Sequence, residues 1–115
     1  MHRILVIADH QSINPQARTY AEYRVFAAVA RHMRFVRRVR VVLRSAEKKP
    51  PHEDRVGCAI TVGLEPSGSL RIRAHGTHVY AAINSAVEQL GRALEQRHRY
   101  GEHFIALQNE TTASN

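Results

Sequence analysis

The chain has 115 residues, 43% hydrophobic and 23% charged, which suits one domain with a buried core and excludes two. Its formal net charge is +7 with all eight histidines neutral, and fifteen of its seventeen basic residues are arginine. A single cysteine, Cys58, excludes an intramolecular disulfide framework. No apolar run could span a bilayer, and the apolar start at residues 4–7 is too short for a signal peptide, so we expect a cytoplasmic protein with no membrane partner.

The first two predicted elements are a strand and a helix. Residues 3–8 form a short β-branched run that is typical of a strand. Asn14 followed by Pro15 predicts a helix start, with a capping side chain and a proline in the first turn. The alanine-rich stretch that follows predicts a helix to about Arg31 or His32.

From residue 37 on, the apolar residues no longer have helical spacing but alternate strictly with polar ones. Three strands are predicted, over residues 37–45, 55–64 and 70–75, with a turn at residues 66–69 between the last two. Lys48 to Asp54, with its two prolines, is the predicted internal loop. Gly76-Thr77 begins a second helix, whose apolar residues keep helical spacing.

This order, β-α-β-β-β-α, predicts a two-layer α/β (α+β) sandwich with a four-stranded mixed sheet and two helices on one face. Only one face of each strand is consistently apolar, so we expect the other sheet face to be open and decorated with arginine. Residues 1–105 are assigned to this domain. Residues 106–115 are assigned to a disordered polar tail, because residues 108–115 contain no large apolar side chain that could anchor them.

The basic residues are concentrated in the middle of the chain. Between Arg31 and Lys49 there are eight basic residues and one acidic residue, Glu47. Like charges that face each other across a sheet are destabilising, and the alternation predicts such a face, made by Arg38, Arg40, Arg71 and Arg73. A solvated face that prevents edge pairing is one interpretation. Because arginine also grips phosphate bidentately, the cluster favours a polyanionic partner, and nucleic acid first.

Several segments resemble a known family. His78-Val79-Tyr80-Ala81-Ala82-Ile83-Asn84, followed by Leu90-Gly91-Arg92-Ala93-Leu94, resembles the last helix of the ribosome hibernation factors. This family includes the short hibernation-promoting factor and the ribosome-associated translation inhibitor, also called sigma-54 modulation proteins. Ile13-Asn14 with Ala17-Arg18, and Val41-Val42-Leu43-Arg44, resemble the start of its first helix and its second strand. The resemblance covers roughly residues 4–99.

The resemblance implies a short-form protein that occupies the decoding channel of the small ribosomal subunit. There it would exclude messenger and transfer RNA during stress or stationary phase, and so inhibit translation. Family members contact ribosomal RNA mostly through basic side chains on the helices and nearby loops, and Arg18, Arg24 and Arg92 match basic positions of the family, as does His98. Together with the central cluster, the predicted RNA-binding residues are Arg18, Arg24, Arg31, Arg34, Arg38, Arg40 and Arg92.

Departures from the family pattern support an alternative function. His78 replaces the acidic residue that usually opens the last helix. The first strand is apolar on both faces, and the first helix is apolar almost all the way round. If exposed, these residues would serve a homodimer or a protein partner: Leu5, Ile7, Tyr23, Phe26 and Val42. The ribosome hypothesis instead expects a monomer, or at most a weak homodimer.

No catalytic residue, metal or cofactor is predicted. His75 and His78, with Cys58 on another strand, fall short of a matched set of zinc ligands. Asp9, His10 and Ser12 lie too close together in one loop to form a triad, and no glycine-rich phosphate loop occurs. Among RNA-binding folds, an RNA recognition motif would carry aromatic residues on its central strands. A double-stranded RNA-binding domain has the element order of residues 15–99, but concentrates lysine at the start of its last helix.

Overall fold

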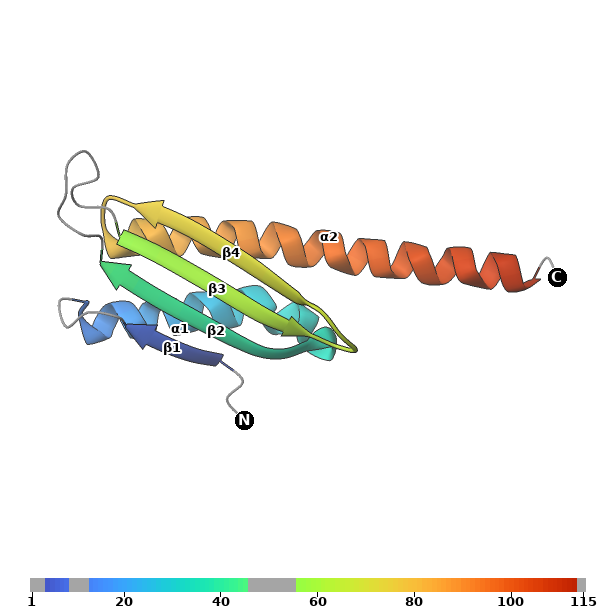
Figure 1. The fold of residues 1–115 in the computed structure, drawn as a ribbon, viewed down its shortest axis with the longest axis horizontal. Coiled ribbons are helices and arrows are strands. Elements are labelled where there is room, and N and C mark those ends of the chain that lie inside the picture. The colour runs from blue at the N-terminus through green and yellow to red at the C-terminus, as the bar shows by residue number, and fades with distance from the viewer. Residues whose placement is uncertain (1–3, 9–12, 46–55, 114–115) are drawn as a thin grey trace.

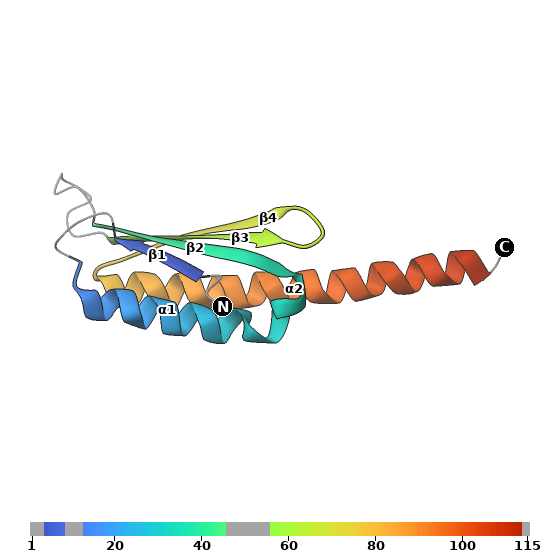
Figure 2. The ribbon, with the colours of Figure 1, turned by 90° about the horizontal axis from the view of Figure 1, so that it is seen from below.

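The fold is a four-stranded sheet with two helices on one face (Figures 1 and 2). The computed structural model describes residues 4–8, 13–45 and 56–113, with side chains at 4–8, 13–44 and 56–98. In chain order the elements are β1 (Ile4–Ala8), α1 (Pro15–Val29), the 3-10 helix η1 (Ala30–Phe35), β2 (Val36–Ser45), β3 (Val56–Leu64), β4 (Ser69–Gly76) and α2 (Val79–Ala113). The predicted β-α-β-β-β-α sandwich is therefore confirmed.

The sheet has the order β1-β2-β3-β4, which makes β1 and β4 its edges. β1 runs parallel to β2, as expected for a right-handed crossover through α1, and β2, β3 and β4 form an antiparallel meander. The predicted turn between β3 and β4 is present: the Leu64 N–H donates to the Gly68 carbonyl over 2.9 Å. Gly68 has a φ of 98°, in the left-handed region that glycine adopts without strain.

The helix α1 begins where the sequence predicts and ends earlier. The Asn14 side chain accepts a hydrogen bond from the Ala17 N–H over 2.6 Å, and Pro15 occupies the first turn, where its missing N–H costs nothing. The helix gives way at Ala30 to η1, in which His32 has non-helical dihedral angles (φ −121°, ψ 19°). His32 is buried there, so tertiary packing at this residue overrides the helix propensity of the segment.

The helix α2 is longer than predicted. The Ala81 N–H donates to His78 Nδ1 over 3.2 Å, so the residue that departs from the family pattern caps the first turn of the helix. At the other end the backbone stays helical to Ala113, beyond the sheet (Figure 1), whereas the sequence predicts a tail from residue 106. Extending an existing helix needs no new nucleus, so residues with adequate helix propensity can continue it without packing against a core. The division into a domain and a polar tail remains a prediction.

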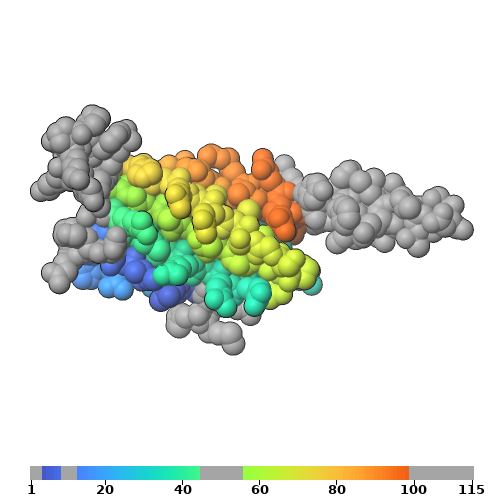
Figure 3. All heavy atoms as spheres, viewed as in Figure 1, coloured from blue at the N-terminus to red at the C-terminus, as the bar shows by residue number. Residues whose placement is uncertain are grey.

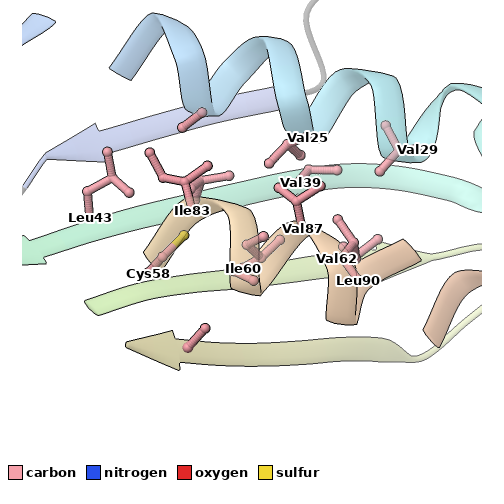
Figure 4. Close-up of a cluster of buried hydrophobic side chains, with 14 of the residues drawn as sticks. Val25, Val29, Val39, Leu43, Cys58, Ile60, Val62, Ile83, Val87 and Leu90 are labelled. Carbon is pink, nitrogen blue, oxygen red and sulfur yellow. The ribbon is translucent and has the colours of Figure 1, made fainter. Parts of the chain in front are cut away.

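The core fills the space between the sheet and the two helices (Figure 4). Alternate residues of β2 and β3 point into it, among them Val39, Leu43, Ile60 and Val62, and meet residues of α1 and α2 such as Leu90. Burying one such side chain, rather than leaving it exposed to water, stabilises the folded state by roughly 1.5–3 kcal/mol. Cys58 lies among them and behaves as a small hydrophobic residue, as predicted. Within the described residues, no helix is long and apolar enough to cross a membrane.

Candidate nucleic-acid interface

The face of the sheet opposite the helices is open and basic. Figure 2 shows both helices on one side of the sheet, and Figure 3 shows the uncovered side, where β2, β3 and β4 form the surface. These three strands contain six arginines and no acidic residue. Two of the predicted RNA-binding residues, Arg38 and Arg40, are exposed here, together with Arg71 and Arg73 of β4. The predicted arginine face is therefore present.

Little neutralises this face from within the described part of the chain. One ion pair, between Arg37 Nε and Glu65 Oε1 at 3.4 Å, lies at the end of the sheet and is half exposed. A second contact, between His32 of η1 and Glu95 of α2, lies away from this face. Because β2 and β4 carry like charges on either side of the uncharged β3, the open face should attract counterions or a polyanion.

On the helical face, arginine takes part in the packing of α1 against α2. Asn84 Oδ1 accepts two hydrogen bonds, from the Tyr20 hydroxyl at 2.6 Å and from Arg24 Nε at 3.3 Å. The Tyr20 ring also meets the Tyr80 ring edge-on, with centroids 5.2 Å apart. Arg24, a predicted RNA contact, is thus half-buried and oriented by Asn84, with its two terminal amino groups left to meet an anion.

Arg18 lies at the β1 edge of the sheet. Its Nη2 donates to the Val6 carbonyl over 3.4 Å, so part of its guanidinium is used to cover the edge strand. The remaining predicted contacts are exposed: Arg31 and Arg34 on η1, and Arg92 on α2. The seven residues therefore do not form one patch, because they are distributed over the open sheet face, the β1 edge, η1 and the helical face.

His32 is a buried site that the sequence analysis missed. It is 5% exposed, its Nε2 lies 3.7 Å from Glu95 Oε2, and its ring centroid is 5.4 Å from Phe35 and 5.6 Å from His98. Burial lowers the pKa of His32 below the ordinary value of 6.5, and Glu95 only partly opposes this effect. The neutral ring joins η1 to α2. Asn84 was missed as well, since no local pattern distinguishes a polar residue between two helices from an exposed one.

The histidine and cysteine candidates do not assemble a metal site in the described residues. Cys58 faces the core, and burial raises the pKa of its thiol to about 12. His75 is exposed on β4, where its neighbour in register is Gly57, so it lies on the opposite face of the sheet from Cys58. Asp9, His10 and Ser12 lie outside the described residues.

The apolar residues of the alternative function lie on opposite sides of the molecule. Tyr23 and Phe26 are 69% and 53% exposed on the outer side of α1. Leu5, 58% exposed, is paired with Arg40 and therefore lies on the open sheet face. Ile7 and Val42, which pair with each other, are half-buried on that same face. A single interface could not use both groups at once.

The fold and its charge define a class of protein, a small basic α/β sandwich with one uncovered sheet face. The family described as sigma 54 modulation protein / S30EA ribosomal protein matches residues 4–100, and the chain belongs to this family of ribosome-associated proteins. The family's roles are ribosome binding, ribosome hibernation and the regulation of translation. The resemblance seen in the sequence is thus confirmed.

Solved structures support this assignment. The N-terminal domain of Protein Y from Thermus thermophilus is similar with a TM-score of 0.65 and 26% identity, covering 84% of this chain and 98% of that one. A ribosomal subunit interface protein from Coxiella burnetii is similar in fold, with a TM-score of 0.67 and 16% identity, covering 86% of this chain and 99% of that one. Among curated proteins none matches.

Proposed function

We propose that this protein binds the small ribosomal subunit in its decoding channel and inhibits translation by excluding messenger and transfer RNA. The family match over residues 4–100 carries the proposal, because it spans the whole sheet, α1 and the part of α2 that packs on the sheet. The name of the Coxiella burnetii relative, a ribosomal subunit interface protein, agrees with this location. The protein would act in the cytoplasm during stress or stationary phase, as a binding protein and not as an enzyme.

The distribution of charge supports a channel rather than a flat surface as the binding site. The domain presents arginine on both of its broad sides: Arg40 is paired with Thr61 on the open sheet face, and Arg92 is exposed on α2, between the buried Leu90 and Leu94. RNA that surrounds the domain would meet cations from each side, and the proposed phosphate contacts are Arg18, Arg24, Arg31, Arg34, Arg38, Arg40 and Arg92. Inhibition is then steric, while the arginines supply the affinity.

Co-sedimentation with separated ribosomal subunits tests this proposal. We expect stoichiometric binding to the small subunit that weakens steeply with salt, by a log–log slope of about 0.7 to 0.9 per phosphate contact. Translation of a reporter message in vitro should fall as the subunit is occupied. An affinity that does not change with salt, or binding to the large subunit alone, would contradict the proposal.

Arg24 allows a sharper version of this test. Arg24→Gln removes one positive charge from the helical face, whereas Glu88→Gln removes a negative charge from the exposed side of α2. We expect weaker small-subunit binding for the first variant and unchanged or stronger binding for the second. Equal loss in both variants would indicate that the helical face contributes through packing rather than through charge.

A further inference from the structure

A groove follows β3 along the open face of the sheet. On this face β3 presents small residues, Gly57, Ala59, Thr61 and Gly63, while its neighbours in register on β2 and β4 are mostly long. The structure has a depression of about 420 Å³ here, and its polar lining residues are Arg40, Arg44, Thr61, Arg71, Arg73 and His75. The central strand is thus the floor of the groove, and the two flanking strands are its walls.

The strand register places the cations in rows across the groove. Arg40 and Arg71 flank Thr61 in one row, and Arg73 lies opposite Val42 across Ala59 in the next. Neighbouring strands are about 4.8 Å apart, so the walls are separated by about 10 Å at the backbone. Residues on one face of a strand repeat about every 6.7 Å, so the cations recur at regular steps along the groove.

Three arginines of the groove have no ion pair among the described residues. These are Arg40, Arg71 and Arg73, and no Asp or Glu occurs within the three strands. Three guanidinium groups around one depression repel one another, and this repulsion is relieved when an anion with several charges binds between them. Arginine is suited to phosphate in particular, because its planar fork can donate two hydrogen bonds to one phosphate.

We propose that this groove binds a single strand of RNA, held by its phosphates and independent of base sequence. Apart from the imidazole of His75 at one end, the floor and walls within the described sheet carry no aromatic ring on which a base could stack, so most contacts fall on the phosphate backbone. An extended peptide is disfavoured, because β3 is paired on both sides and its backbone has no hydrogen-bonding groups to offer an added strand. A narrow groove with cations on both walls admits one phosphodiester chain more readily than a duplex, whose phosphates face outward along two separate edges.

This site goes beyond the proposed function and does not rest on it. It assigns Arg40 to a groove with Arg71 and Arg73, two members of the predicted arginine face that are not among the seven predicted RNA contacts. It also gives the open sheet face a ligand of its own, distinct from contacts made through Arg24 and Arg92 on the helical face. A ribosome-bound protein could therefore hold a passing single strand, and the free protein could bind one without the ribosome.

The test measures binding of the full-length protein to a fluorescent oligouridine of about ten nucleotides, within the usual range of single-strand sites. The groove variant Arg71→Gln/Arg73→Gln is compared with Arg37→Gln/Arg97→Gln, which loses the same charge outside the groove, and neither variant removes a proposed contact to the small subunit. We expect the groove variant to bind at least about tenfold more weakly and its log–log salt slope to fall by about 1.4, as for two lost contacts to a single strand. The matched control should change both quantities much less.

A third variant tests the shape of the groove at constant charge. Ala59→Ile places a β-branched side chain on the floor, where it should block a strand without weakening the sheet. We expect weaker oligouridine binding with an unchanged thermal unfolding midpoint. Equal losses in the groove and control variants, no effect of Ala59→Ile, or tighter binding of an RNA duplex or of polyglutamate would each overturn the proposal. Small-subunit binding measured on the same variants keeps this outcome separate from that of the proposed function.

Discussion

Arginine on the helical face and arginine on the open sheet face have different surroundings. Arg24 donates to Asn84 and Arg18 donates to the Val6 carbonyl, so both contribute to the fold as well as to its charge. Arg40, Arg71 and Arg73 have no ion pair among the described residues; Arg40 and Arg71 lie on either side of Thr61, and Arg73 lies in the next row. The comparison teaches that equal charges can have opposite effects on stability, depending on whether the protein supplies an acceptor.

The largest effect should come from the core, on which both faces depend. Leu90 is fully buried between α2 and the sheet, so Leu90→Ala should lower the free energy of unfolding by about 2–5 kcal/mol. Urea denaturation followed by circular dichroism measures this. Arg92→Ala, two residues away and exposed, is the control and should change stability by less than about 0.5 kcal/mol. Similar losses in the two variants would contradict the assigned orientation of α2.

A smaller loss of stability is expected when the side chain that accepts a hydrogen bond from Arg24 is removed. Asn84→Ala leaves the Tyr20 hydroxyl and Arg24 Nε without their common partner, and should lower the free energy of unfolding by about 1–2 kcal/mol. Asn84→Asp keeps an acceptor and adds a charge beside Arg24, so it should retain most of the stability. The same urea titration distinguishes them. Equal destabilisation by both substitutions would show that these hydrogen bonds do not stabilise the helix pair.

Because His32 is buried between η1 and α2, it should make the free energy of unfolding depend on pH. Burial lowers its pKa in the folded state, so the unfolded state binds more protons between the folded pKa and 6.5. Its contribution to stability is therefore complete above pH 6.5 and is lost as the pH falls through the folded pKa. His32→Phe, which keeps a ring beside Phe35, should flatten the dependence of unfolding free energy on pH in this window. An unchanged slope in the variant would contradict this assignment.

On the open sheet face, removing an arginine should not lower the free energy of unfolding and should tend to raise it. Arg73→Gln removes one member of a repelling group, so it should leave stability unchanged or raise it by up to about 1 kcal/mol at low salt. Added salt should stabilise the native protein more than the variant, because screening relieves the same repulsion. Thermal unfolding over a range of salt concentrations measures both effects. Destabilisation of about 1 kcal/mol or more by Arg73→Gln would mean that Arg73 has a protein partner after all.

The smallest effect is expected on the outer side of α1. Tyr23 and Phe26 are exposed, so Tyr23→Ser/Phe26→Ser should change the free energy of unfolding by no more than about 1 kcal/mol. Under the ribosome hypothesis the double variant should also keep the solution mass of the native protein in light scattering. A native dimer that the double variant converts to a monomer would favour the alternative function.

The sequence predicted what local periodicity determines. Alternation in β2 and β4 assigned arginine to one face, and Asn14-Pro15 located the start of α1. It could not predict η1, because the break at His32 depends on packing against His98, far along the chain. The joint acceptor role of Asn84 and the row formed by Arg40, Thr61 and Arg71 were also inaccessible, since both depend on how distant elements are aligned.

The most direct test of the central claim is cryo-electron microscopy of the purified protein with small ribosomal subunits at low salt. We predict density for the four-stranded domain in the decoding channel, overlapping the path of messenger and transfer RNA, with RNA phosphates near Arg24 and Arg92. Density elsewhere on the subunit, with the channel open, would contradict the account. The same map would show whether RNA also reaches the open sheet face.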